Sequence, residues 1–166
     1  MTAAAKPRTA TVTLPTDRTI LITRKFDAPR HLLFKAWTTP ELVKCWWPAG
    51  QGEASAVEID LRVGGAWRYE MRTNDGTEVA FHGEYLEVVP DERLVSTELN
   101  DSTPQVTALR TVTFVEEGAS TAMRVTIEFE SKDHRDLYLS WMGDGLQLAV
   151  ALFEKTVLSL MHPDRR

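Results

Sequence analysis

A change of hydrophobic period divides this chain and limits how it can fold. From residue 54 to residue 130, apolar and polar side chains alternate, which is typical of strands that bury one face. From Ser131 to Leu160, apolar residues recur every three or four positions, which predicts helix. A sheet with one apolar face therefore has to be covered by one long amphipathic helix.

Seven strands are predicted, and their connections are short. Residues 17–26 alternate and form the first strand, and the region 54–130 contains six more. Within that region, Trp67, Tyr69 and Met71 alternate with charged side chains, and the Asn-Asp-Gly sequence at 74–76 predicts a tight turn. Short connections favour antiparallel neighbours, so the strands are expected to form one meandering antiparallel sheet.

Two short helices are predicted between the first strand and the others. Pro29 and Pro40 each suit the first turn of a helix, because the φ angle of proline fits there and its missing N–H needs no partner. Apolar residues at helical spacing follow each proline: Leu32, Leu33, Ala36 and Trp37 after the first, and Leu42, Val43, Trp46 and Trp47 after the second. Gly143 and Gly145 are expected to break or kink the helical region near the C-terminus.

This order of elements predicts an α+β fold in which a curved antiparallel sheet wraps around a long C-terminal helix. Sheets curl because their strands twist, and a curved sheet with one helix across it rarely closes completely. A cavity is therefore expected between the sheet and the helix, roofed by the two short helices. Residues 17–162 are expected to form one domain, preceded by a flexible N-terminal tail over residues 1–16.

The composition excludes several classes of protein. The 166 residues carry 19 Lys and Arg against 24 Asp and Glu, a formal net charge of −5. A mildly acidic chain suits neither general nucleic-acid binding nor attachment to an anionic membrane surface, and no apolar run is long enough for membrane insertion. The chain starts without a signal-peptide core, and its single cysteine, Cys45, fits a reducing compartment, so a cytoplasmic location is expected.

Several short segments form a recognisable set when they are taken in order. They are ITRKFDAP (22–29), WTTPEL (37–42), WWP (46–48), GGAWRY (64–69) and PDERLV (90–95), followed by Ser131, Arg135, Asp136, Met142 and Gly145. Together they resemble the family of homologues of the activator of the heat-shock protein 90 ATPase, over about residues 18 to 161. This family is part of the helix-grip (SRPBCC) superfamily, with START lipid-transfer domains, the birch-pollen allergen and polyketide cyclases.

The resemblance implies a helix-grip fold with a cavity for a hydrophobic ligand, without implying one ligand or one reaction. Two features depart from the family. The eukaryotic co-chaperone carries an additional N-terminal domain, for which this chain has no room. Trp141 stands where a glycine is expected before Met142, which is expected to reshape the cavity near the final helix.

A set of large, mostly apolar side chains is predicted to line the cavity. For any single residue, plain core packing is the simpler reading, but so many aromatic side chains in a small domain favour an aromatic-lined cavity when the resemblance is added. The predicted lining residues are Trp37, Trp46, Trp67, Tyr69, Met71, Phe81, Tyr85, Arg110, Val112, Phe114, Trp141, Met142, Leu146 and Val150.

Arg110 shares its strand parity with the apolar Val112 and Phe114, so it is expected to point inward. A buried arginine is costly unless it is paired. It could hold a carboxylate or phenolate ligand in the cavity, or it could pair with Glu98 or another acid, and both readings stay open. Arg24 poses the same question on the first strand, where an ion pair at the edge is favoured.

His82-Gly83-Glu84 is the most enzyme-like local group, because histidine can act as a general base near neutral pH. If Phe81 and Tyr85 point inward, His82 and Glu84 face solvent unless a bulge at Gly83 changes the register, and the exposed reading is favoured. The four histidines show no metal-binding spacing, and Cys45 is read as a semi-buried structural thiol. No catalytic residue, metal or cofactor is predicted.

Three functions remain open. The first is binding of a small hydrophobic or aromatic molecule in the cavity, with Arg110, Tyr69 or His82 setting its orientation. The second is a cyclase-like, aromatase-like or hydrolytic enzyme that uses the same cavity and needs a titratable pair inside it. The third is a chaperone-associated ATPase activator that acts by protein contact through an exposed patch. The first is preferred, and a homodimer is compatible with all three.

Overall fold

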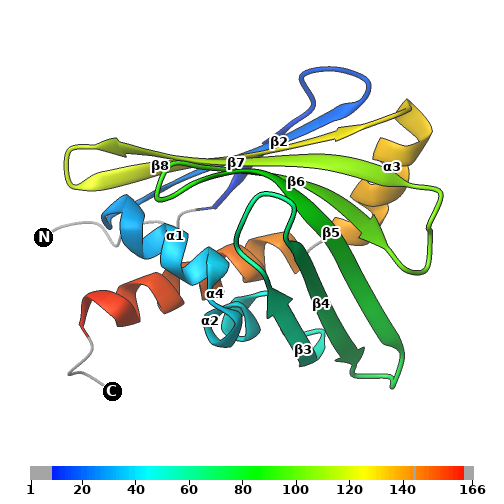
Figure 1. Ribbon diagram of the computed structural model, residues 1–166, viewed down its shortest axis with the longest axis horizontal. Coiled ribbons are helices and arrows are strands. Elements are labelled where there is room, and N and C mark those ends of the chain that lie inside the picture. Colours follow the sequence, from blue (N-terminus) through cyan, green and yellow to red (C-terminus); the bar gives the residue numbers. More distant parts are fainter. Residues whose placement is uncertain (1–8, 144, 163–166) are drawn as a thin grey trace, which may run out of the picture.

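The computed structural model describes residues 9–143 and 145–162 (Figure 1). Its helices and strands follow the order that the hydrophobic period predicts. In chain order they are β1 (Thr11–Thr13), β2 (Thr19–Phe26), α1 (Arg30–Thr38), α2 (Pro40–Trp46), β3 (Gly52–Ile59), β4 (Ala66–Thr73), β5 (Glu78–Val89), β6 (Arg93–Asn100), β7 (Thr107–Glu117), β8 (Ser120–Phe129), α3 (Lys132–Met142) and α4 (Gly145–Met161).

The strands form one antiparallel sheet in the order β1-β2-β8-β7-β6-β5-β4-β3. Strands β3 to β8 are joined to their sequence neighbours, as the short connections predict. Strand β2 instead pairs with β8, with Ile22 opposite Val125, so the first long strand lies beside the last one.

The sheet has eight strands, one more than predicted. The additional strand, β1, lies inside the segment expected to be a tail: Thr11 to Thr13 pair with Thr23 to Leu21 of β2. The backbone of an edge strand carries unpaired N–H and C=O groups, which a short β-branched segment can satisfy. Three residues next to a proline give too weak a period to be recognised from sequence. The remainder of that segment, residues 1–8, lies outside the described residues.

Two prolines mark the starts of the short helices. Pro40 is the first residue of α2, as predicted, whereas Pro29 lies one residue before α1, at its N-cap position. The C-terminal helical region is broken after α3 at Gly143, whose φ of 41° is unfavourable for residues with a β-carbon. Ser131 is the N-cap of α3, and its hydroxyl accepts a hydrogen bond from the His134 amide at 3.1 Å.

The hydrophobic core lies between the concave face of the sheet and α4, with α1 and α2 beside it (Figure 1). Val150, Phe153 and Val157 are the buried apolar residues of α4, and they repeat at helical spacing. Each such side chain contributes about 1.5–3 kcal/mol when it is fully removed from water. The α+β helix-grip architecture expected from the order of elements is therefore confirmed.

Gly83 allows close packing in the middle of the sheet. It lies opposite Trp67 on β4, and the Trp67 indole Nε1 passes over it to donate a hydrogen bond to the Thr97 carbonyl at 3.2 Å. A β-carbon at Gly83 would collide with that carbonyl oxygen and would lie 2.6 Å from the indole nitrogen. The irregular pairing of β5 with β6 lies between Tyr85 and Glu87, so the bulge considered at Gly83 is absent there.

Replacing Gly83 with alanine is expected to lower the free energy of unfolding by about 3 kcal/mol, because the new methyl group overpacks the sheet and displaces the indole hydrogen bond. Urea denaturation measures this. Gly118→Ala is the control: its φ is 65° but nothing lies within 4 Å of an added β-carbon, so only about 1 kcal/mol of backbone strain is expected. Equal losses in the two variants would show that the collision is not felt.

Candidate ligand-binding cavity

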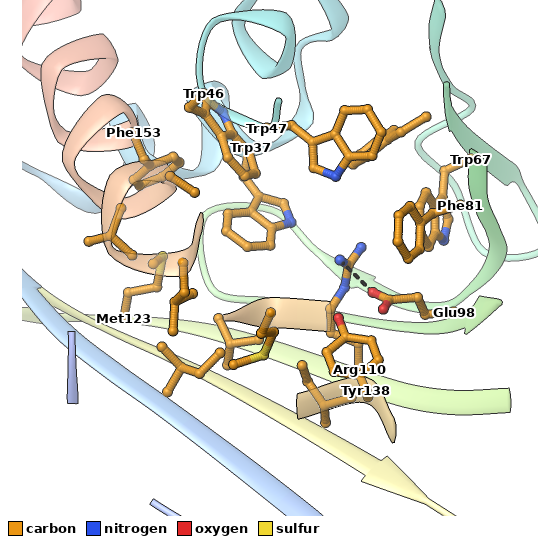
Figure 2. A pocket seen from close by; sticks show the side chains of 18 residues that line it. Trp37, Trp46, Trp47, Trp67, Phe81, Glu98, Arg110, Met123, Tyr138 and Phe153 are labelled. Atoms are coloured by element: carbon orange, nitrogen blue, oxygen red, sulfur yellow. Dashed lines mark ion pairs between the residues drawn. The ribbon is translucent and has the colours of Figure 1, made fainter. Parts of the chain in front are cut away.

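A cavity of about 180 Å³ lies between the concave face of the sheet and the helices, as Figure 2 shows. Its wall is built by residues from strands β2 and β4 to β8 and from helices α1 to α4, together with the residue that follows α2. The lining residues are Ile22, Trp37, Trp46, Trp47, Trp67, Tyr69, Phe81, Glu98, Arg110, Met123, Val125, Ile127, Tyr138, Met142, Leu146, Ala149, Val150 and Phe153.

Ring-to-ring contacts hold the aromatic side of the cavity in place. The centroids of Trp37 and Trp46 are 4.9 Å apart, and those of Trp47 and Tyr69 are 5.4 Å apart in an edge-to-face arrangement. The Trp46 indole Nε1 also donates a buried hydrogen bond to the Ala36 carbonyl at 3.0 Å. The two short helices and the residue after α2 thus place three tryptophans on the side of the cavity opposite the sheet, where these helices were expected to cover it.

Most of the side chains predicted from sequence lie in the cavity wall. These are Trp37, Trp46, Trp67, Tyr69, Phe81, Arg110, Met142, Leu146 and Val150. Met71, Tyr85, Val112, Phe114 and Trp141 lie outside it. Phe114, for example, is buried against Phe34 of α1, with ring centroids 6.0 Å apart. Strand parity predicts the face of a residue, but not its position along the curved sheet.

The wall also includes residues that the sequence analysis did not assign to it: Ile22, Trp47, Glu98, Met123, Val125, Ile127, Tyr138, Ala149 and Phe153. The parity of Ile22 and of the alternating β8 residues already favoured the inner face. Tyr138 had no such signal, because its place depends on how α3 folds back against β8.

The polar part of the wall is an ion pair. Arg110 Nη1 on β7 lies 2.9 Å from Glu98 Oε1 on β6, and the two side chains are 14% and 4% exposed. The guanidinium carbon lies 4.8 Å from the Trp67 ring centroid and 5.7 Å from that of Trp37, which adds cation–π stabilisation. Arg110 therefore combines features of both alternatives: it is paired with Glu98, and it also lines the cavity.

The charges of this pair dominate the electrostatics of the cavity. Burial has the largest single effect on the pKa of the Arg110 guanidinium and lowers it, but the electrostatic interactions with Glu98 and with the nearby tyrosines together outweigh burial, so the pKa of Arg110 is raised. Burial, followed by the charge of Glu98 that its hydroxyl approaches, raises the pKa of Tyr138 well above its usual value. Two buried polar atoms of the pair, Glu98 Oε2 and Arg110 Nε, have no hydrogen-bond partner among the described residues.

The enzyme-like group at His82 lies outside the cavity wall. His82 Nδ1 is 2.8 Å from Asp101 Oδ1, and both side chains are about two fifths exposed. Arg68 Nη2 also binds Asp101 at 2.7 Å, and the hydrogen bond from Arg68 is the main reason why the pKa of Asp101 is lowered. Glu84 is exposed on the same strand, so neither it nor His82 can act on a molecule in the cavity.

The other residues singled out from sequence lie away from the cavity. Arg24 forms the favoured ion pair, since its Nη2 lies 2.6 Å from Glu154 Oε2 on α4, but the expected place at an edge is wrong: its side chain is buried and β2 lies between β1 and β8. Cys45 was expected to be semi-buried, and this is wrong: it is exposed on α2, because the buried stripe of this helix passes through Val43 and Trp46.

Within 9–143 and 145–162, no three His, Cys, Asp or Glu side chains converge in a way that could hold a metal ion. In the same ranges, no helix combines the length and the apolar character needed to cross a bilayer.

A curved antiparallel sheet that grips a C-terminal helix over an apolar cavity defines the helix-grip, or SRPBCC, class of proteins. The family model described as "Activator of Hsp90 ATPase homolog 1-like protein" matches residues 27–157. The chain belongs to this family, as the resemblance of its motifs implied. No curated protein sequence matches it.

Solved structures share the fold over nearly the whole chain. A protein from Rhodobacter sphaeroides is 20% identical with a TM-score of 0.82, and the match covers 91% of this chain and 99% of that one. A protein from Chromobacterium violaceum is 27% identical with a TM-score of 0.69, covering 83% and 99%. The AHSA1-like protein from Aeromonas hydrophila is 20% identical with a TM-score of 0.64, covering 85% and 94%.

Breaking the buried pair is expected to cost more than removing it. Arg110→Met leaves the Glu98 carboxylate buried without its counter-ion, which is expected to lower the free energy of unfolding by about 3–5 kcal/mol. Replacing both partners, with Glu98→Leu added, is expected to return stability to within about 1 kcal/mol of the wild type. Urea denaturation of the two variants measures this, and a double variant as unstable as the single one would show that the charges do not compensate each other.

The tyrosines are expected to resist alkaline ionisation. Burial raises the pKa values of Tyr69, Tyr85 and Tyr138, the three tyrosines of the chain. The unfolded chain loses these protons near pH 10, so the stability that the neutral phenols contribute is present below about pH 10 and is lost as the pH rises through the folded values.

Phenolate absorbance is therefore expected to appear together with unfolding, rather than before it, in an alkaline titration followed in parallel by circular dichroism. The urea-unfolded chain, which should titrate near pH 10, is the control. A tyrosine that ionises near pH 10 while the circular dichroism remains that of the folded protein would contradict this.

Proposed function

We propose that this protein binds a small hydrophobic or aromatic molecule in the cavity between the sheet and α4. The observation that carries the proposal is an apolar, aromatic cavity of about 180 Å³ whose wall is drawn from both layers of the fold. Core packing normally leaves few voids larger than a water molecule. A space lined mainly by apolar side chains, with a few polar groups, has the composition usual for a small-molecule site.

The source of affinity would be burial of the apolar surface of the ligand. Four tryptophans line the cavity: Trp37, Trp46, Trp47 and Trp67. Their rings offer flat surfaces, and the edge-to-face contacts that fix them reduce the entropy lost when a ligand binds. Because tryptophan fluorescence responds to nearby molecules, the same side chains would also report binding.

A second candidate function is supported by one observation. A cyclase-like or hydrolytic enzyme needs a titratable group inside the cavity, and the buried carboxylate of Glu98 is such a group. The other titratable side chains in the wall are its partner Arg110 and the tyrosines Tyr69 and Tyr138, whose pKa values are raised. Without a histidine or a second carboxylate in the wall, binding remains the better supported function.

The family name suggests a third candidate, contact with a chaperone. It would be favoured by an apolar patch on the outer face of the sheet. On β4 that face carries Arg68, Glu70 and Arg72, and Arg68 Nε binds Glu70 Oε2 at 2.8 Å. This charged and internally paired surface gives the chaperone reading no specific support.

Filling the cavity is expected to abolish binding. Ala149 lines the cavity from α4, so Ala149→Phe places a ring in the space that the ligand would occupy. The affinity for single-ring aromatic probes, measured by isothermal titration calorimetry, is expected to fall at least about tenfold, which is 1.4 kcal/mol.

Ala151→Phe is the matched control, because Ala151 is exposed on the same helix and the substitution is the same. It is expected to leave affinity unchanged. Binding that persists in Ala149→Phe, or that is lost equally in both variants, would place the ligand elsewhere.

A further inference from the structure

We propose that the ligand of this cavity is an uncharged aromatic molecule of about one ring that carries a hydroxyl group, which contacts the Glu98–Arg110 pair. The inference rests on the proposed function and specifies the class of ligand. In Figure 2, Arg110 projects from the sheet toward the tryptophans, with Glu98 beside it and Tyr138 below. The polar groups of the wall are thus gathered at one place, while the rest of the wall is mainly apolar.

The size of the cavity limits the ligand to about one ring. A dry apolar cavity of about 150 Å³ is enough to bind benzene, and this cavity measures about 180 Å³. Drug-sized molecules and lipids usually occupy pockets of about 300–1,000 Å³. A single ring with one small substituent therefore fits the space as it stands.

The charge of the wall excludes an ionised ligand. Among the described residues of the cavity wall, Arg110 is the only cation, and Glu98 already neutralises it at 2.9 Å. A bound carboxylate would put a second negative charge beside one guanidinium, and a bound ammonium would lie beside Arg110 itself. Removing such a charge from water is not compensated when no counter-charge is free. The preferred ligand is therefore neutral.

The unmet hydrogen-bonding capacity of the pair indicates a hydroxyl group. Glu98 Oε2 is buried without a hydrogen-bond partner, and a buried carboxylate oxygen gains most from a donor. The other oxygen, Oε1, is already engaged by Arg110, so Oε2 is the oxygen of this cavity-lining carboxylate that is left for a further donor. A hydroxyl can donate to Glu98, whereas a carboxylate or a plain hydrocarbon cannot.

Tyr138 already places a phenol beside the Glu98 carboxylate, as the proposed ligand would. The Tyr138 phenol approaches the same carboxylate from α3 and stays neutral there, as the raised pKa of Tyr138 indicates. A phenolic ligand beside Glu98 would stay protonated for the same reason. The rings of Trp37 and Trp67, which flank the Arg110 guanidinium, provide aromatic surfaces for its ring.

The test is isothermal titration calorimetry of the full chain with four probes that share one ring: phenol, toluene, benzoate and benzylammonium. Phenol is expected to bind at least about tenfold more tightly than toluene, and both ions are expected to bind at least about tenfold more weakly than phenol. Toluene that equals phenol, or benzoate that binds most tightly, would overturn this inference but leave the proposed function standing. If no probe binds, the proposed function fails as well.

Variants of Glu98 test whether this residue causes the preference for phenol over toluene. In Glu98→Gln the preference for phenol over toluene is expected to disappear, and benzoate is expected to gain affinity because Arg110 has lost its counter-ion. Glu84→Gln makes the same change at an exposed position of β5 and should keep the wild-type order. If Glu98→Gln does not fold, the paired variant Glu98→Leu with Arg110→Met serves instead, with toluene expected to exceed phenol. A wild-type order in either Glu98 variant would overturn the proposal.

Discussion

The ring of Phe153 on α4 is the contact on which the rest of this structure depends. Its centroid lies 5.4 Å from that of Phe26 on β2, 5.7 Å from Trp37 on α1 and 5.2 Å from Trp46 on α2, in edge-to-face arrangements. One fully buried side chain thus joins the sheet, the roof and the C-terminal helix. Because these elements are fixed to one another at the middle of α4, the cavity beside Phe153 keeps its walls.

The second constraint is the Glu98–Arg110 pair, because burying two charges costs free energy. Removing two charges from water is expensive, and apolar residues of similar volume would often be no less stable. The pair here lies in the wall of a cavity, with two of its polar atoms lacking partners. A charge pair that leaves hydrogen-bonding capacity unused is poorly explained by stability alone, and the proposed role in selecting a ligand would account for it.

The sequence predicted the fold more completely than the site. Period and turn signals identified seven of the strands and the broken C-terminal helix, because side-chain alternation and glycine conformation are local properties. The strand β1 was missed because its pairing with the β2 edge is a long-range contact of only three residues. In the site, Trp67 and Arg110 could be predicted from strand parity, whereas Tyr138 could not, because α3 had to fold back first.

What the sequence determined by itself is which side chains face inward and which elements carry them, since the alternation of strands and the helical repeat are written in neighbouring residues. Only the tertiary structure decided which of those inward residues share a space. The curvature of the sheet separates Phe114, packed under α1, from Arg110, which lines the cavity from the same strand. The pairing of β6 with β7 places Glu98 beside Arg110, and the packing of α3 brings Tyr138 to them, because the meeting of distant segments depends on tertiary packing rather than on local pattern.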